Sequence, residues 1–169
     1  MPEVTLRHEM DCTEDTYWNK CIFDEEYNRR LFLDALKFPG FTLLESTDDA
    51  DRKTKKARID PPVTGIPGPV KKAIGDRFSY VEDGVYDKKT KRYRCVITPS
   101  TFPDKTKVTA ELWCETLGEK RIARNVRVSV EVKVFMLGGM VEDKILQDLR
   151  HSYDVAATFT NAFVKEKGY

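Results

Sequence analysis

Hydrophobic and polar residues alternate along residues 3–12, the first regular pattern in the chain. Val4, Leu6, His8, Met10 and Cys12 occupy alternate positions, and charged or polar residues fill the positions between them. Strict alternation places one set of side chains in the core and the other set in water. We therefore predict a β-strand from Glu3 to Cys12, with His8 on its apolar face.

Two short helices are expected directly after this strand. Thr13 precedes two acidic residues and suits a helix N-cap, and the apolar residues that follow recur at helical spacing. Asp24 can cap a second helix, because apolar residues at helical spacing follow it as well. Pro39 and Gly40 bring this second helix to an end.

The middle of the chain carries six further strand patterns separated by short turns. They run from Phe41 to Thr47, Arg52 to Asp60, Asp76 to Tyr86, Lys91 to Thr98, Lys107 to Glu115 and Arg121 to Phe135. Connections this short favour antiparallel pairing in chain order. A proline-rich segment from Pro61 to Pro69 interrupts the series and leads into a short helix that Gly75 ends.

The chain closes with a long amphipathic helix from about Val141 to Lys165, which at ~1.5 Å per residue spans about 37 Å. Its predicted inward face carries Ile145, Leu149 and Ala156. The order of elements predicts an α+β helix-grip fold, in which a curved antiparallel seven-stranded sheet wraps around the C-terminal helix. Two short helices follow strand 1, and a short helix lies between strands 3 and 4.

Composition is consistent with one soluble domain over residues 1–169, since 40% of the residues are hydrophobic and 34% are charged. The 29 Lys and Arg residues nearly cancel the 28 Asp and Glu residues, so the net charge is +1. Such a chain has no global field to hold nucleic acid. It also lacks the apolar run of a signal peptide or of a transmembrane anchor, and we expect a cytoplasmic protein.

The basic residues Lys53, Lys55, Lys56 and Arg58 lie in one predicted strand. They form either a basic patch for lipid headgroups or, as is more common, a lysine-rich edge strand that prevents sheets from pairing. Function is therefore not assigned from this run. The four cysteines have neither metal-site nor redox spacing, and we interpret them as small apolar residues in a reducing compartment.

The sequence contains few side chains that could act as catalytic acids, bases or nucleophiles. His8 and His151 are the only histidines, and neither lies in a metal or triad motif. Tyr80, Glu82, Tyr86 and Tyr93 either orient a ligand or act as structural residues, and Glu82 either lies near a cavity mouth or pairs with an inward cation such as Arg124. Gly138-Gly139 lacks the partners of a phosphate-binding motif. We therefore predict no catalytic residue, no metal and no cofactor.

Two segments carry a family resemblance: Ile66 to Gly75 (IPGPVKKAIG) and Leu137 to Glu142 (LGGMVE). With the order of elements, they resemble an uncharacterised bacterial branch of the START-like superfamily, which is named for steroidogenic lipid-transfer domains. Similarity to the sterol-carrying, VASt-type domains of membrane-contact-site proteins is weaker, and the tethering role of those proteins does not carry over. The resemblance covers nearly the whole chain and implies a ligand cavity between the sheet and the long helix.

The predicted cavity set mixes small residues with large apolar ones. A curved sheet closed by one helix leaves a volume that either a ligand occupies or side chains fill as a solid core. The expected cavity residues are His8, Met10, Phe78, Tyr80, Tyr93, Ile97, Leu112, Val128, Val130, Ile145, Leu149, Ser152, Tyr153 and Ala156. The expected gate comprises Ile66, Pro67 and Phe102.

Together with these patterns, the resemblance implies that the chain binds an apolar small molecule such as a lipid, sterol or isoprenoid, with intracellular transfer as a further expectation. An enzyme that resembles polyketide cyclases or dehydratases and uses the same cavity is an alternative, and a regulatory protein-interaction domain is another. The inventory favours binding over catalysis. Exposed Phe102 and Ile66 are either ordinary loop residues or points of transient membrane contact.

Overall fold

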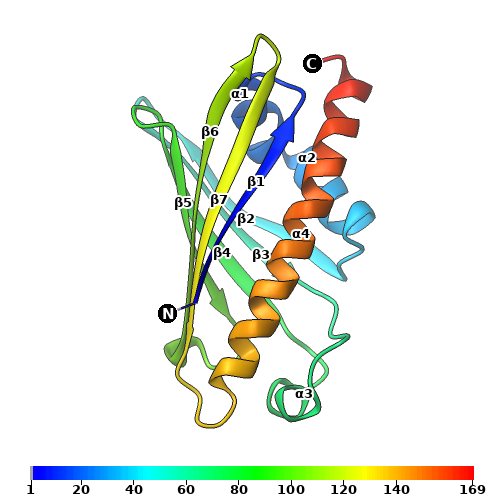
Figure 1. Ribbon diagram of the computed structural model, residues 1–169, viewed down its shortest axis with the longest axis vertical. Helices are drawn as coiled ribbons and strands as arrows, with labels where there is room; N and C mark the ends of the chain where they lie inside the picture. Colours follow the sequence, from blue (N-terminus) through cyan, green and yellow to red (C-terminus); the bar gives the residue numbers. More distant parts are fainter. Residues whose placement is uncertain (1) are drawn as a thin grey trace.

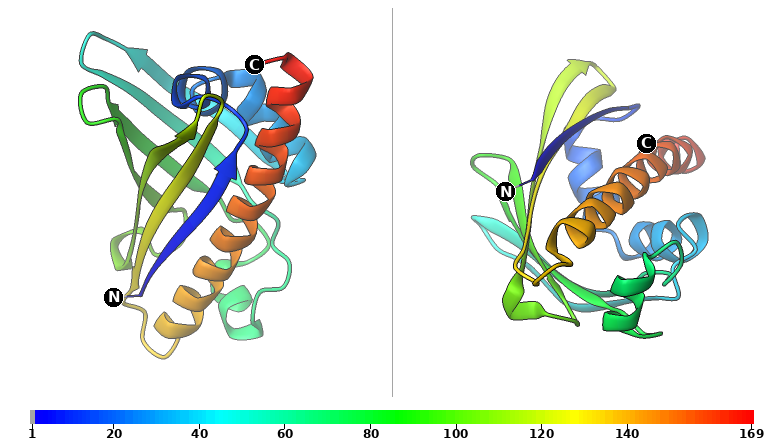
Figure 2. Two further views of the ribbon diagram at one scale, coloured as in Figure 1. Left: turned by 45° about the horizontal axis from the view of Figure 1, so that its top comes forward. Right: turned by 60° about the horizontal axis from the view of Figure 1, so that its bottom comes forward.

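The computed structural model describes residues 2–169, which form a curved sheet wrapped around one long helix (Figures 1 and 2). The strands are β1 (Glu3–Met10), β2 (Gly40–Asp48), β3 (Arg52–Asp60), β4 (Tyr80–Asp87), β5 (Arg92–Pro99), β6 (Thr106–Gly118) and β7 (Arg121–Val132). All neighbours are antiparallel, in the order β1-β7-β6-β5-β4-β3-β2. This arrangement confirms the predicted helix-grip fold.

Helices cover the concave face and both ends of the sheet. They are α1 (Glu14–Thr16), the π-helix η1 (Tyr17–Ile22), α2 (Glu25–Arg29), the π-helix η2 (Arg30–Ala35), α3 (Gly68–Ile74), the short 3₁₀-helix η3 (Pro103–Lys105) and α4 (Gly138–Lys167). In Figure 1, α4 runs the length of the molecule, α1 and α2 lie near its C-terminal end, and α3 lies near its N-terminal end. Within residues 2–169, no helix is both long and apolar enough to cross a bilayer.

The predicted helix caps after β1 are present. Thr13 accepts a hydrogen bond from the backbone N–H of Thr16 at 3.1 Å, and Asp24 accepts one from Tyr27 at 2.9 Å. Each cap satisfies a backbone donor that the first turn of a helix leaves free. Both helices then widen into π-helices, η1 and η2, which the residue pattern did not predict. The π-helix η1 buries Tyr17 and Trp18 against the sheet.

The valine-rich strand β7 supplies the predicted inner face. Val126, Val128 and Val130 are fully buried, whereas Arg127 on the opposite face is exposed. Residues 122 to 132 of β7 pair with β6, and residues 122 to 129 pair with β1 on the other side. The strand is therefore central in space as well as apolar on one side, which explains its regular alternation.

Several strand boundaries differ from the predictions by one to four residues, and two of them have a clear backbone cause. β4 begins at Tyr80 rather than Asp76, because Tyr80 pairs with Pro99, whose nitrogen cannot donate to the ladder. β7 ends at Val132 rather than Phe135, since Met136 adopts a left-handed conformation (φ 61°) that turns the chain away. α4 then starts at Gly138, where any side chain would collide with the carbonyl oxygen of Val132.

The interpretation of residues 52–60 as an edge strand was wrong. β3 lies between β2 and β4 and pairs with both, so its backbone is not open to a partner molecule. β1 and β2 form the edges instead. The lysines of β3 therefore do not protect an edge, and one of them, Lys55, is only 7% exposed because it points inward.

Candidate functional site

Three small cavities lie in a row between the sheet and α4. The first, near the middle of the molecule, has a volume of about 90 Å³, and the next two have about 100 Å³ each. Tyr80, Ile97, Leu149 and Ser152 line both the first and the second cavity. Phe78 and Ile145 line both the second and the third. Shared walls place the cavities side by side along the first half of α4.

Arg124 is the most unusual residue of the first cavity, because its charged side chain is only 2% exposed. Its guanidinium lies over the ring of Tyr153, 5.0 Å from the centroid. Nη2 donates to Nδ1 of His8 at 3.0 Å and to the backbone oxygen of Tyr153 at 3.2 Å, while Nη1 approaches the Tyr17 hydroxyl at 3.4 Å. Nε is buried and has no hydrogen-bond partner.

His8 holds Arg124 in place rather than lining the cavity. Because Arg124 donates to Nδ1, the ring proton lies on Nε2, which donates to the carboxylate of Asp154 at 2.6 Å. Asp154 lies on α4 and is largely exposed. The chain of contacts from Asp154 through His8 therefore ties the helix to β1 and β7 and fixes the orientation of the guanidinium.

Lys55 brings a second cation to the same cavity. Its ammonium donates to the backbone oxygen of Ile22 at 3.1 Å and lies 3.5 Å from the side-chain oxygen of Asn28. Asn28 is itself buried and donates to the backbone oxygens of Ile22 and Asp24. The helices after β1 thus supply neutral oxygen acceptors for a buried lysine.

Glu82 is the carboxylate of this cavity. The hydroxyl of Tyr93 donates to it at 2.8 Å. The ring of Tyr93 crosses directly over Gly84, where any side chain would overlap the phenol, so glycine is required for this contact. Glu82 is therefore bonded to Tyr93 rather than paired with Arg124, the cation considered from the sequence.

Burial sets the ionisation of the cavity tyrosines. It raises the pKa of Tyr17, of Tyr80 and of Tyr153 above the ordinary value, and for Tyr93 the nearby charge of Glu82 adds to this effect. A phenol with a raised pKa keeps its proton at neutral pH. The hydroxyls of Tyr17, Tyr80 and Tyr153 are therefore available as hydrogen-bond donors to a ligand, whereas that of Tyr93 already donates to Glu82.

The structure brings together ten of the fourteen residues expected to line a cavity. Eight line the first cavity: Tyr80, Tyr93, Ile97, Leu112, Leu149, Ser152, Tyr153 and Ala156. Phe78 and Ile145 line the other two. His8, Met10, Val128 and Val130 are not among the lining residues. The last three are fully buried under α4, where they pack as core.

The expected gate lies at the third cavity. Ile66 and Phe102 line it, whereas Pro67 caps α3 beside it. Six polar or aromatic residues of the first cavity were not identified from the sequence as cavity residues, namely Tyr17, Tyr27, Asn28, Phe32, Lys55 and Arg124. Lys55 and Arg124 share the strand parity of buried neighbours, and this parity is the signal that marks them as inward.

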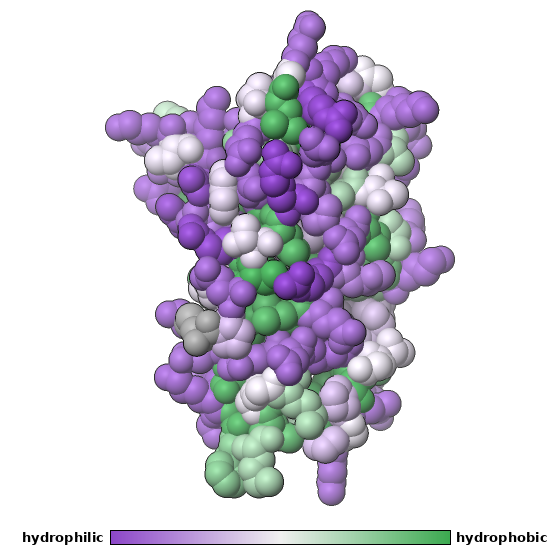
Figure 3. Space-filling model, viewed as in Figure 1, coloured by the Kyte–Doolittle hydropathy of each residue, from purple (hydrophilic) through white to green (hydrophobic). Residues whose placement is uncertain are grey.

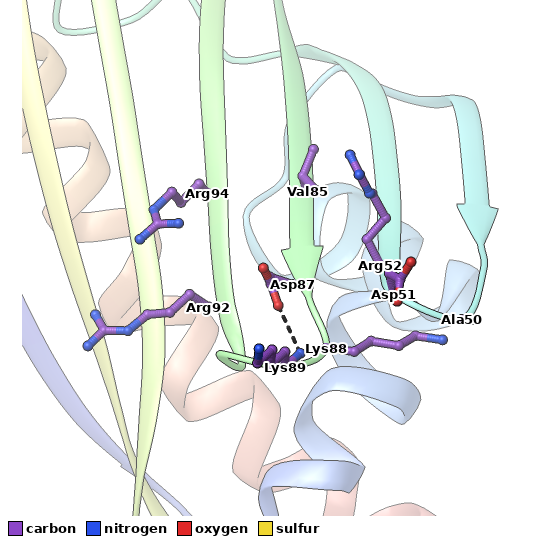
Figure 4. Close-up of a pocket in the computed structure, with 9 residues that line it drawn as sticks. All are labelled: Ala50, Asp51, Arg52, Val85, Asp87, Lys88, Lys89, Arg92 and Arg94. Atoms are coloured by element: carbon purple, nitrogen blue, oxygen red, sulfur yellow. Dashed lines mark hydrogen bonds between the residues drawn. The ribbon is translucent and has the colours of Figure 1, made fainter.

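A wider depression of about 580 Å³ lies on the outer face of the sheet, away from α4 (Figure 4). Its basic side chains spread apart, and several already have carboxylate partners: Arg92 and Arg94 each contact Glu111 at 2.7 Å, and Lys88 contacts Asp48. It is open to water and has no apolar wall comparable to that under α4. The small cavities under α4, with their more apolar walls, are therefore the better candidate for a ligand site.

Comparisons with known proteins agree with this geometry. The family model described as "Protein of unknown function (DUF2505)" matches residues 5–164. No curated protein matches the sequence. Solved structures with similar folds include a START superfamily protein from Mycobacterium smegmatis, at 16% identity and a TM-score of 0.63, with 97% of each chain covered.

Two further solved structures of similar fold are enzymes. The ZhuI aromatase/cyclase from Streptomyces sp. R1128 is 7% identical, with a TM-score of 0.66 over 99% of this chain and 96% of that one. Norcoclaurine synthase from Thalictrum flavum, solved with dopamine and hydroxybenzaldehyde, is 12% identical, with a TM-score of 0.65 over 98% and 87%. Structural similarity at identities this low establishes the START-like helix-grip fold. It does not establish the chemistry of this chain.

Proposed function

Because this chain belongs to the DUF2505 family and has the START-like helix-grip fold, we propose that it binds an apolar small molecule between the sheet and α4 and carries it. The row of three cavities is the observation that supports this proposal. Each cavity is small, but together they approach the lower limit of about 300 Å³ that is typical of ligand pockets. An elongated ligand requires only that their thin shared walls move apart.

The first half of α4 suits such a movement. Its inward residues Val141, Ile145 and Leu149 are only partly buried, and none of the fully buried residues of the helix precedes Ala156. A segment with few buried apolar contacts opens at lower cost than a packed core. We therefore assign ligand entry to this half of the helix.

A fluorescence experiment tests the binding proposal. An apolar probe whose emission rises in a dry environment is added to protein purified without detergent, and unlabelled apolar compounds are then titrated in. We expect a saturable signal that such compounds displace at micromolar concentrations. Mass spectrometry of an organic extract of the same protein identifies any molecule that co-purifies. Absence of displacement by alkyl, sterol and isoprenoid compounds alike contradicts the proposal.

Membrane contact during transfer is the second part of the proposal. Phe135 and Met136, in the connection from β7 to α4, are 89% and 85% exposed. Figure 3 shows apolar side chains gathered at this lower end of the molecule. Leu137 follows these residues and lines the third cavity, as does Phe102, another exposed apolar residue. An apolar tip beside a cavity mouth suits ligand exchange with a lipid surface.

Vesicle flotation tests this contact. We expect the protein to float with vesicles that contain anionic lipid and the variant Phe135→Ser/Met136→Ser to remain in solution, while both bind the soluble probe equally. Leu44→Ser serves as the control, because Leu44 is 51% exposed but lies on the edge strand β2. Equal flotation of the wild type and the tip variant contradicts a role of the tip in membrane contact.

Catalysis in the first cavity is a second candidate function, and the Tyr93–Glu82 hydrogen bond favours it. The Glu82 carboxylate can take a proton from the carbon beside a ligand carbonyl while the Tyr93 hydroxyl gives its proton to the carbonyl oxygen, which forms an enol; the proton held by Glu82 then returns to Tyr93 across their hydrogen bond. Incubation of the protein with aromatic polyketide-like carbonyl compounds, followed by product analysis, tests this candidate. Product formation that Glu82→Gln abolishes supports it, and turnover unaffected by this change removes Glu82 from the reaction.

A further inference from the structure

The charge of the first cavity indicates the chemical class of its ligand. Two cations, Arg124 and Lys55, and one carboxylate, Glu82, line this cavity. Arg124 and Lys55 are 2% and 7% exposed. Among residues 2–169, no carboxylate lies within 4.0 Å of either cationic group. A buried charge without a counter-ion costs several kcal/mol, so a ligand that brings a negative charge stabilises this arrangement.

Arg124 is the better placed of the two cations. A guanidinium has five N–H donors, and only three contacts from this one are present, of which the contact to Tyr17 at 3.4 Å is long. Nε is buried without a partner, which is uncommon in folded proteins and costly for a charged group. Lys55, in contrast, has two oxygen acceptors from the neighbouring helices. Arg124 therefore has donor capacity that the protein itself does not use.

The surroundings of Arg124 hold the guanidinium ready for a ligand. The ring of Tyr153 lies beneath it, and the Asp154–His8 pair accepts from its Nη2. A group fixed by its neighbours before the ligand arrives loses little conformational entropy on binding. The first cavity, at about 90 Å³, also has room for a group the size of about three water molecules, at ~30 Å³ each.

We propose that Arg124 binds the oxyanion head, a carboxylate or its equivalent, of an apolar ligand whose tail occupies the two apolar cavities along α4. This inference rests on the proposed binding function and specifies its ligand as an amphipathic acid. Arg124 and the hydroxyl of Tyr17 hold the head, and apolar residues such as Phe78, Ile145 and Leu149 surround the tail. The wet, exposed basic surface of Figure 4 plays no part.

A matched pair of ligands tests the proposal. Decanoate and decanol have the same tail and differ in the charge of the head. We expect the wild-type protein to bind decanoate at least about tenfold more tightly than decanol in calorimetric titration, since a hydrogen bond to a charged group contributes more than a neutral one. Arg124→Met is expected to remove this preference, because the loss of the guanidinium weakens decanoate binding far more than decanol binding. Arg127→Met is the control, because Arg127 lies on the outer face of the same strand.

A second readout is the effect of each ligand on the wild-type protein itself. In the wild type, the NMR signal of the Arg124 Nε–H is expected to shift when decanoate is added and not when decanol is added. The signal is assigned to Arg124 because it is absent from the spectrum of Arg124→Lys. Arg124→Lys keeps the charge and loses the planar fork, so we expect an intermediate preference. A signal that moves with neither bound ligand overturns the proposal and indicates that Nε–H meets only water or a structural neighbour.

Failure of the oxyanion site and failure of the proposed binding function give different results. Equal binding of decanoate and decanol overturns the oxyanion site and leaves the binding of an apolar molecule intact. Loss of the preference in Lys55→Met but not in Arg124→Met also overturns it, because the head then lies at Lys55. If the wild type binds neither ligand nor any apolar competitor in the fluorescence experiment, the proposed function fails and the inference fails with it.

Discussion

The two halves of α4 face different interiors although they belong to one continuous helix. From Ala156 to Val164 the helix buries five side chains, and Phe163 packs edge to face on Tyr27 at 5.3 Å. From Gly138 to Val155 none of its residues is fully buried, and the three cavities lie beneath. The fold alone therefore does not leave space, because the same sheet and helix enclose a filled core at one end.

The difference comes from what the sequence places opposite the helix. α2 delivers Tyr27 against the second half of α4, where its ring packs on Phe159 and Phe163 and its hydroxyl is hydrogen-bonded to Thr160. No comparable aromatic element covers the first half, where the proline-rich segment and α3 close the molecule instead. Space for a ligand is thus set by side chains that lie far from α4 in sequence.

Truncation of one side chain in each half of α4 is expected to give the largest difference in stability between the two halves. Phe163→Ala removes a ring that is 2% exposed, and we expect a loss of about 3 to 5 kcal/mol in the free energy of unfolding. Leu149→Ala, at a partly buried position beside existing cavities, is expected to cost about 2 kcal/mol or less. Urea unfolding of both variants measures the difference. Equal losses contradict the distinction between a filled and an open half.

Enlargement of a small residue in each half is expected to change the free energy of unfolding by less than truncation does. Here the larger loss of stability is again expected in the packed half. Ser152→Leu places an apolar group between the first two cavities, and we expect stability to stay within about 1 kcal/mol of the wild type while probe binding is lost. Ala157→Leu, in the packed half, is expected to cost about 1 to 3 kcal/mol through overpacking.

The variants Ser152→Leu and Ala157→Leu are compared both by urea unfolding and by probe binding. Strong destabilisation by Ser152→Leu means that the space between the cavities does not accept a side chain or a ligand tail. Unchanged probe binding in that variant means that the ligand lies elsewhere.

The architecture was predictable because each strand buries one face. Alternation along β1 and β7 and the apolar stripe of α4 each reflect one element against one core, and local sequence is enough to predict them. The π-helices η1 and η2 carry no such signal, since their apolar residues fit an α-helical spacing equally well. The left-handed turn at Met136 was missed because methionine rarely adopts this backbone conformation, and the predicted β7 was therefore too long.

The candidate site depends on relations between distant segments. Arg124 meets His8, Tyr17 and Tyr153 only after β7, β1, η1 and α4 have come together. The Tyr93–Glu82 bond requires the register of β4 and β5 and the absence of a side chain at Gly84. Strand parity points to Lys55 and Arg124 as inward residues, but the partners of a buried charge follow from tertiary packing.

The smallest expected effect concerns the ion pairs that fasten the packed end of α4. Arg30 contacts Glu166 at 2.6 Å, and Lys167 contacts Glu26 at 2.7 Å, so α2 and η2 are tied to the last turn of the helix. The hydrogen bond from Arg30 lowers the pKa of Glu166 below its ordinary value of 4.5, and the one from Lys167 lowers that of Glu26. In the first half of α4, Lys144 contacts Asp148 of the same helix, and the contact of Asp154 with His8 is the tie to the sheet.

The sign of the pH dependence follows from these lowered pKa values. A carboxylate whose pKa is lower in the folded state stabilises the protein above the pKa of the unfolded chain, and this contribution is lost as the pH falls through the folded value. We therefore expect Glu166→Gln to lower the melting temperature slightly at pH 7, with the difference from wild type vanishing towards pH 3. Because these groups are exposed, high salt is expected to reduce the difference at neutral pH. Glu119→Gln, at a turn residue for which the described chain provides no ion pair, is expected to show no such trend, and a difference that persists at pH 3 would mean that Glu166 acts through packing rather than charge.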